Sequence, residues 1–364
     1  MAAQKNIVPY KATHPGILIK DELEARPDFK QKDLAKELGV KASFLNEIIK
    51  GKRPITPEMA VLLEGVFEIP ASYWMKFQYQ YEIDNARIKE KTIARLKNIE
   101  IWKVIKEYVP VNYFKKQGYL KDDLEKDIPT IKAIYNVSNV DDLVTTFAGH
   151  KLSFYRKSEK LQVDEKNMFA WSSLAIHEAK QQSIRAFEPG SVNQLCQELN
   201  TIFFENNHTI EKVKSTLNQF GIKLVQIKKL DKTPVDGFSF WSENNPAIAL
   251  TLRHNRIDNF AFTLMHEIAH IYLHLTTNKE KSFLDLTQNK SKNVFEEEAD
   301  QFAQKKLISE NCWKDIKTNN LCPTDDLIFE VSHKHQTHPA IILGRISYEL
   351  NHYAIKTGID KKLN

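Results

Sequence analysis

Residues 262–274, FTLMHEIAHIYLH, carry three histidines and one glutamate among apolar residues at helical spacing. His266 and His270 are four residues apart, so on a helix they lie on one face, about 6 Å apart along the axis. Two imidazoles placed in this way can hold one zinc ion, and the adjacent Glu267 can polarise a water molecule beside it. The alternative is a core helix whose histidines are satisfied by hydrogen bonds.

A zinc site that performs catalysis needs a third protein ligand and one open position. Downstream, the sequence NVFEEEADQFAQKKLIS predicts a helix over residues 293–307, with three acids near its start, Glu296, Glu297 and Glu298. Glu296 and Asp300 form an i, i+4 pair, so one carboxylate could bind the metal while the other orients a ligand imidazole. The spacing leaves open which acid of the trio binds. The alternative is an exposed acidic helix start, which the helix dipole favours.

A hydrolytic site also needs a donor for the negative charge that develops in the transition state. Four side chains qualify by residue type alone, and these are Arg253, Tyr272, His274 and His338. His274 lies eight residues after His266 and shares its side of the helix, but it can equally be a partly exposed histidine. His338 can instead cap the helix that begins at Pro339.

The N-terminal segment, residues 14–83, predicts five short helices, because apolar residues recur at helical spacing between Gly and Pro breaks. Residues 31–38, a turn at Gly39, and residues 42–50 match a helix-turn-helix. Thr56 before Pro57 predicts a helix start, with the hydroxyl as N-cap.

The second helix of this motif would present polar side chains to a DNA major groove. We expect base contacts from Lys41, Ser43, Asn46 and Phe44, and phosphate contacts from Gln31, Lys50, Lys52 and Arg53. Between residues 29 and 53 there are seven Lys/Arg and three Asp/Glu, a net charge of +4. Glu47 is the exception, and it either accepts from a cytosine amino group or points away. A helical bundle with a solvated basic face is the alternative.

The remaining pattern predicts a small sheet followed by helices. Short strands are expected at residues 223–227, 237–241 and 247–252, and helices at 259–275, 293–307, 323–334 and 339–354. Residues 98–190 are mostly helical. The fold class is therefore multidomain and mainly α, with an α+β C-terminal domain. We expect domains at residues 1–97, 98–190 and 191–364.

Composition fits a folded cytoplasmic protein. The chain has 364 residues with a net charge of +5, and no apolar run approaches the about 20 residues that a membrane span needs. Its start lacks the apolar core of a signal peptide, which argues against a secreted protease. The three cysteines form no CxxC, so the sequence predicts neither a disulfide framework nor a cysteine zinc site.

Two resemblances extend these motifs. HPG, LAKELGV and LNEIIKGKRPITPEMAVLLEGVF resemble the HigA-type antitoxin branch of the XRE, lambda-repressor-like family. GIKLVQI, VDGFSFW, HEIAHIYLH, EEEADQFAQKKLIS and THPAIILGRISYEL resemble the ImmA/IrrE zinc metallopeptidase family. The second resemblance implies zinc at His266, His270 and Glu296, with Glu267 as general base. It also implies a reduced gluzincin-like fold, in which the strand at residues 237–241 could be an edge that takes a peptide.

Together the resemblances imply a DNA-binding regulator, dimeric on operator double-stranded DNA, that carries a zinc endopeptidase domain. The substrate would be a peptide bond in a repressor, a toxin or the chain itself. We expect one Zn²⁺ per chain, although manganese or iron can occupy similar sites. The alternative is a non-proteolytic antitoxin or repressor whose metallopeptidase-like domain is a sensor or a structural module.

Overall fold

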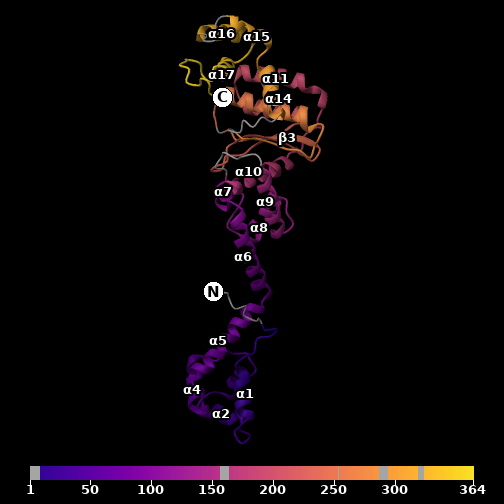
Figure 1. The fold of residues 1–364 in the computed structure, drawn as a ribbon. Helices are drawn as coiled ribbons and strands as arrows, with labels where there is room; N and C mark the ends of the chain where they lie inside the picture. The colour runs from indigo at the N-terminus through magenta and orange to yellow at the C-terminus, as the bar shows by residue number, and fades with distance from the viewer. Residues whose placement is uncertain (1–8, 156–163, 253, 287–293, 319–323) are drawn as a thin grey trace. The chain divides into compact units, whose positions relative to one another are not determined.

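The computed structural model describes residues 9–155, 164–252, 254–286, 294–318 and 324–364. It divides into two compact units, Met1–Ile101 and Trp102–Asn364, whose elements are labelled in Figure 1. Within the described ranges, no helix combines the length and the apolar character that a membrane span requires. The predicted boundaries at residues 97 and 190 remain predictions.

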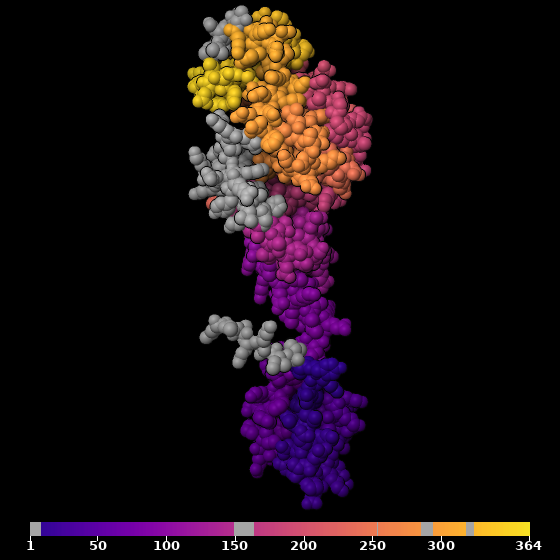
Figure 2. Space-filling model, turned by 45° about the vertical axis from the view of Figure 1, so that its right-hand side comes forward, coloured from indigo at the N-terminus to yellow at the C-terminus, as the bar shows by residue number. Residues whose placement is uncertain are grey.

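The first unit contains the five helices that the sequence predicts. They are α1 (Gly16–Glu24), α2 (Gln31–Glu37), α3 (Ala42–Ile49), α4 (Pro57–Phe67) and α5 (Ala71–Ile88). Their apolar faces bury a shared core that includes Leu34, Leu45, Ile48 and Trp74, and they pack into the indigo and purple body of Figure 2. The helix-turn-helix and the mainly helical fold class are thus confirmed.

Local chemistry sets the ends of these helices as predicted. Gly39 adopts a φ of +67° between α2 and α3, where a residue with a side chain would be strained. Val40 N donates to Ala35 O at 2.9 Å and closes the turn. Thr56 Oγ1 accepts from Met59 N at 3.3 Å, so the predicted N-cap of α4 is present.

The start of α1 packs tightly against the end of α3. A Cβ atom on Gly16 would lie 2.2 Å from Ile48 O and 2.9 Å from Ile49 O. His14 Nδ1 accepts from Gly16 N at 2.9 Å, and its ring meets Tyr81 edge-on at 4.7 Å. This close approach holds the helix that was predicted to read DNA against the rest of the unit.

Helix α6 (Glu90–Tyr108) runs through the boundary into the second unit, which begins with helices. These are α7 (Val111–Lys116), α8 (Leu124–Tyr135), α9 (Val140–Tyr155) and α10 (Glu165–Lys180). Helix α10 is buried along much of its length and contacts α8, α9, β1 and β2. Trp171 of α10 lies 6.1 Å from the ring of Phe238 in the sheet. The helical region therefore packs directly on one face of the sheet.

The sheet has four strands in the order β1-β3-β2-β4. They are β1 (Lys223–Gln226), β2 (Val235–Ser242), β3 (Asn245–Leu250) and β4 (Phe283–Leu286), and only β1 and β3 run parallel. The sequence predicts the first three strands but misses β4. Because β4 pairs with β2, the expectation that residues 237–241 form a sheet edge is wrong. Among the described residues, the sheet ends at β1 and β4.

The remaining helices complete the second unit (Figure 1) and close its main core. They are η1 (Pro189–Ser191), α11 (Val192–Glu205), α12 (Thr209–Gln219), α13 (Ile257–Ala269), α14 (Val294–Leu307), α15 (Glu310–Thr318), α16 (Asp325–His335) and α17 (Pro339–Glu349). Helix α13 is apolar on nearly every face and packs against α14, α17, β2 and β3. It continues as a π-helix, η2 (His270–Leu275), so the helix predicted over residues 259–275 is present, with π geometry beyond Ala269.

We predict that Gly16→Ala destabilises the first unit by about 1–3 kcal/mol, because the new methyl group would overlap the Ile48 carbonyl oxygen. Amide hydrogen exchange across α1–α5 of the intact chain measures the loss. Gly65→Ala in α4 is the matched control, since nothing lies within 4 Å of its added Cβ. That control should stabilise α4 by about 0.5–1 kcal/mol, and equal protection in both variants would contradict the prediction.

Candidate metal centre

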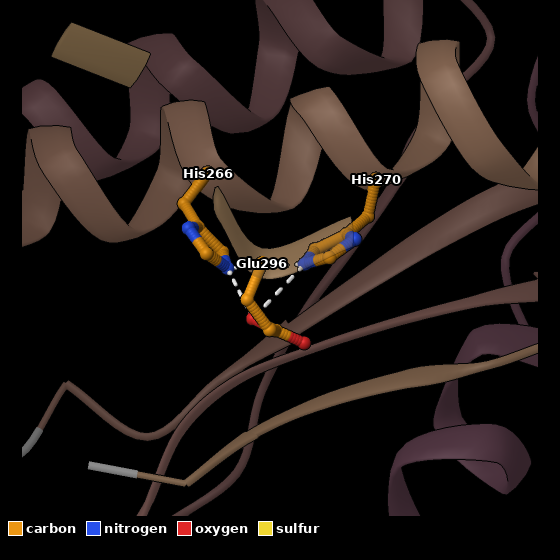
Figure 3. A group of neighbouring side chains, drawn as sticks. All are labelled: His266, His270 and Glu296. Atoms are coloured by element: carbon orange, nitrogen blue, oxygen red, sulfur yellow. Dashed lines mark hydrogen bonds and ion pairs between the residues drawn. The ribbon is translucent and has the colours of Figure 1, made fainter. Parts of the chain in front are cut away.

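Two imidazoles and one carboxylate converge on a single point (Figure 3). His266 Nε2 lies 3.0 Å from His270 Nε2 and 3.2 Å from Glu296 Oε2. His270 Nε2 lies 3.5 Å from the same Glu296 oxygen. Among the described residues, these three side chains form a group that could hold a metal ion, with their nitrogen and oxygen atoms within 4.8 Å of one another.

The helices bring these groups together through ordinary packing. His266 lies in the last turn of α13 and His270 begins η2, so their i, i+4 spacing puts both rings on one side. Glu296 stands in the first turn of α14, which packs along α13. The small buried residues Ala299 and Ala303 face this contact and allow close approach.

The donor set fits a zinc ion. Asp300 Oδ1 lies 2.9 Å from His266 Nδ1, and an ionised carboxylate only accepts, so this nitrogen carries the proton. In neutral His266 the lone pair of Nε2 then faces the other two groups. Tetrahedral zinc with bonds of about 2.0 Å holds neighbouring ligand atoms about 3.3 Å apart, close to the three separations of 3.0, 3.2 and 3.5 Å.

The protonation states also suit a cation. Burial lowers the pKa of His270 to about 4, which keeps its imidazole neutral near pH 7. Burial by itself would raise the pKa of Glu296, but its polar contacts with the His266 and His270 rings outweigh burial and hold this pKa well below its usual range. The cluster therefore offers two neutral nitrogens and one anionic oxygen.

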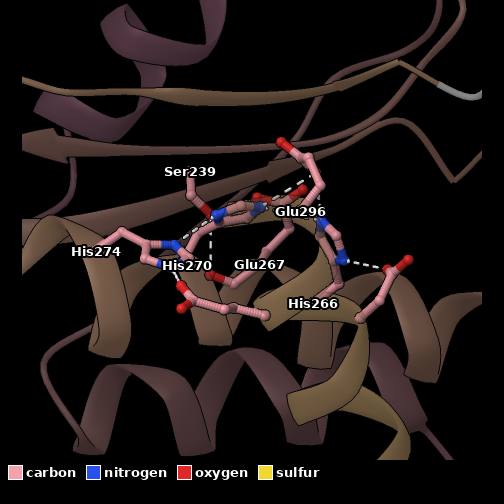
Figure 4. Close-up of polar contacts among 8 residues, drawn as sticks. Ser239, His266, Glu267, His270, His274 and Glu296 are labelled. Carbon is pink, nitrogen blue, oxygen red and sulfur yellow. Dashed lines mark hydrogen bonds and ion pairs between the residues drawn. The ribbon is translucent and has the colours of Figure 1, made fainter. Parts of the chain in front are cut away.

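Glu267 is fully buried between α13 and the sheet (Figure 4). Ser239 of β2 donates a short hydrogen bond to Glu267 Oε2, and the same hydroxyl lies 3.0 Å from the Glu267 carbonyl oxygen. A Cβ atom on Gly237 would lie 2.2 Å from Glu267 Oε1. Sequence reasoning missed both residues, although a Gly and a Ser inside the apolar run VDGFSFW were the available signal.

The four predicted oxyanion donors lie in different surroundings. Arg253 lies outside the described residues. Tyr272 Oη is 3.2 Å from Ser191 Oγ and its ring packs on Phe187, whereas His338 Nδ1 accepts from Ala340 N at 3.2 Å and caps α17. His274 is 5% exposed and bonds through both ring nitrogens, so the expectation of a partly exposed histidine is wrong.

The predicted DNA-contacting residues lie on the α2–α3 surface. Lys41, Ser43, Lys50, Lys52 and Arg53 are exposed, and Gln31, Phe44 and Asn46 are half-buried. Arg53 forms an ion pair with Glu47 and lies 5.3 Å above the Phe44 ring. Glu47, the one acid on the predicted DNA-reading helix, is thus paired with Arg53.

Comparison with known families supports a helix-turn-helix part and a metallopeptidase-like part in this chain. Residues 19–74 match the family described as Helix-turn-helix, and residues 217–334 match the IrrE N-terminal-like domain, a peptidase family. Virulence-associated protein I of Dichelobacter nodosus is 33% identical over 91 residues, covering 25% of this chain and 82% of that protein. Virulence-associated protein A of the same organism is 32% identical, covering 28% of this chain and 92% of that protein. The chain belongs to their helix-turn-helix family, and its second half carries an IrrE-like domain.

Two solved structures similar to this chain each cover about a quarter of it. The Pseudomonas aeruginosa antitoxin HigA with the higBA promoter is 32% identical, with a TM-score of 0.22, over 25% of this chain and 92% of that chain. A HigA-family addiction-module antidote protein from Coxiella burnetii is 26% identical, with a TM-score of 0.23, over 24% of this chain and 92% of that chain.

We predict that the purified chain binds one zinc ion, measured by elemental analysis after dialysis. Glu296→Gln should weaken zinc affinity by more than about 100-fold, because it replaces the charged ligand oxygen by a neutral amide. Glu297→Gln removes the same charge from the exposed neighbouring residue and should bind zinc as the wild type does. Equal affinities for the two variants would contradict the predicted ligand set.

Proposed function

We propose that this protein is a DNA-binding regulator of antitoxin type whose second unit is a zinc-dependent endopeptidase. The convergence of His266, His270 and Glu296, with Glu267 next to His266 on the same buried helix, carries the proposal. The match to an IrrE-like peptidase family supports it independently. The substrate is a peptide bond in a partner repressor or toxin, or in the chain itself.

In the proposed hydrolysis, different residues of the chain have different roles. His266, His270 and Glu296 would hold the metal, which would supply Lewis-acid polarisation of the scissile carbonyl and of a water molecule. Glu267 takes a proton from the attacking water while the oxygen of that water bonds to the carbonyl carbon. Glu267 then delivers that proton to the leaving amine as the C–N bond breaks. Ser239 orients the Glu267 carboxylate through its hydrogen bond.

Strand β4 offers a place for an extended peptide beside the proposed metal centre. It ends the sheet among the described residues. Phe283 of β4 stacks on the His270 ring at 4.3 Å, with 14° between the planes, so the edge runs next to a ligand. A peptide added to this edge would use backbone hydrogen bonds for affinity, as in other strand-addition sites.

One observation favours a second candidate, a non-proteolytic sensor or structural domain. Glu267 has no exposed surface, and its carboxylate already accepts the Ser239 hydroxyl. A general base in this position reaches a substrate water only when the surrounding packing admits one. Zinc binding without turnover would therefore favour the sensor over the peptidase.

The first unit supplies the proposed operator binding. Its exposed Lys41, Ser43, Lys50 and Lys52 lie on or next to α3, and Asn46 is half-buried among them. Bases are read by side chains on such a helix, while lysines near its ends hold the phosphates. A Pseudomonas aeruginosa protein that is similar to part of this chain is known in complex with its operator DNA. We propose that this chain binds a two-fold operator as a homodimer.

We predict that Glu267→Gln lowers peptide hydrolysis by about 10²–10⁴-fold, because the amide cannot take up the proton. Zinc content should stay at the wild-type level, since Glu267 is not in the ligand cluster. The assay incubates zinc-loaded wild type and variant with a random peptide library, with and without DNA, and identifies fragments by mass spectrometry. Identical fragment patterns from both proteins would contradict the peptidase proposal and favour the non-proteolytic sensor.

We predict that Lys52→Ala weakens DNA binding to all sequences alike and lowers the salt dependence of log K by about 1, because one phosphate contact is lost. Asn46→Ala should instead reduce discrimination between bases by about 1–3 kcal/mol. Affinities are measured on duplexes selected by the wild type from a random pool, across several salt concentrations. Lys20→Ala, in the ion-paired face of α1, is the control and should change neither quantity.

A further inference from the structure

His274, the third histidine of the metal helix, joins the proposed centre through a chain of hydrogen bonds. Its Nδ1 lies 3.0 Å from His270 Nδ1, and its Nε2 lies 3.0 Å from Glu298 Oε2. Figure 4 shows the His274 ring turned toward His270, on the side away from the point where the ligand atoms meet. His274 thus contacts a ligand imidazole and a carboxylate rather than the metal position.

Hydrogen-bond chemistry fixes the direction of this chain when the rings are neutral. The ionised Glu298 carboxylate only accepts, so His274 Nε2 carries a proton and His274 Nδ1 is an acceptor. The hydrogen between the two rings must then sit on His270 Nδ1. His270 Nε2 is left with its lone pair, and this atom lies 3.5 Å from Glu296 Oε2 in the ligand cluster.

The backbone and the aromatic neighbours hold both rings in this arrangement. The helix widens to π geometry at His270, which alters the angle between His270 and His274 compared with an α-helix. Phe283 stacks on the His270 ring at 4.3 Å, and Phe295 of α14 meets the His274 ring edge-on at 4.9 Å. Ring orientation is therefore set by packing as well as by hydrogen bonds.

We propose that His274 and Glu298 are positioning residues that hold His270 in the tautomer whose Nε2 binds the metal. This inference rests on the proposed metal centre. It also gives a role to each of three carboxylates near the start of α14. Glu296 is the ligand, Asp300 orients His266 directly, and Glu298 orients His270 through His274. Each ligand imidazole is then supported by its own carboxylate.

The test measures zinc affinity of the full chain by competition with a chromogenic chelator. Glu298→Ala removes the acceptor and should weaken zinc binding by about 10–100-fold. Glu298→Gln keeps an acceptor oxygen and should restore affinity close to the wild-type value. Glu297→Ala is the matched control on the exposed neighbouring residue and should bind as wild type. Glu298 is itself exposed, so none of these changes should unfold the chain.

A second measurement needs no metal. Two-bond ¹H–¹⁵N spectra of the metal-free chain, labelled at histidine, report which nitrogen of His270 carries the proton. We expect Nδ1–H in the wild type and a mixture of tautomers in Glu298→Ala. Unchanged zinc affinity in Glu298→Ala, or equal weakening in Glu297→Ala and Glu298→Ala, would overturn the inference. A wild type that shows the Nδ1–H tautomer but binds no zinc would instead refute the metal centre.

Discussion

The structure around the candidate site depends on the close approach of three lone-pair donors. Two imidazole nitrogens and a carboxylate oxygen meet with separations of 3.0–3.5 Å inside a largely apolar unit. Without a cation such groups repel or must share protons, and burial strengthens that cost. The small residues that let α14 approach α13, and the carboxylates behind His266 and His274, all serve this convergence. A metal ion is the simplest group that satisfies all three donors at once.

The close approach of these three groups also determines which residues of the sheet contact α13. Because His266 and His270 face α14, Glu267 between them turns toward β2, where Gly237 leaves room and Ser239 donates to its carboxylate. Strand β4 then covers the far edge of β2 and sends Phe283 onto the His270 ring. The strand that was expected to receive a peptide instead contacts Glu267, the proposed general base. Among the described residues, the edge of the sheet lies one strand further out, at β4.

The sequence predicted the parts of this protein that local periodicity encodes. The five N-terminal helices, three of the four strands and the pairing of an HExxH helix with an acidic helix follow from spacing and turn residues. Strand pairing is non-local, so no local pattern distinguishes the interior β2 from an edge, and the short β4 went unrecognised. The π-helix at His270 and the separate contacts of Glu296 and Glu298 depend on how α14 docks. Spacing alone could not separate the members of that trio.

Exposure across the centre indicates the side from which a ligand arrives. The side chains of His266 and His270 are 5% and 1% exposed, whereas those of Glu296, Asp300 and Glu298 are 27%, 42% and 52% exposed. Among the described residues, the exposed side chains of the centre come from the start of α14, whereas those of α13 and η2 are buried. A substrate that approaches from that side would meet Glu296, the proposed third ligand, before Glu267, the proposed general base. Access to Glu267 then separates the proposed peptidase from the proposed sensor, because both need the same three metal-facing groups, which already lie close together.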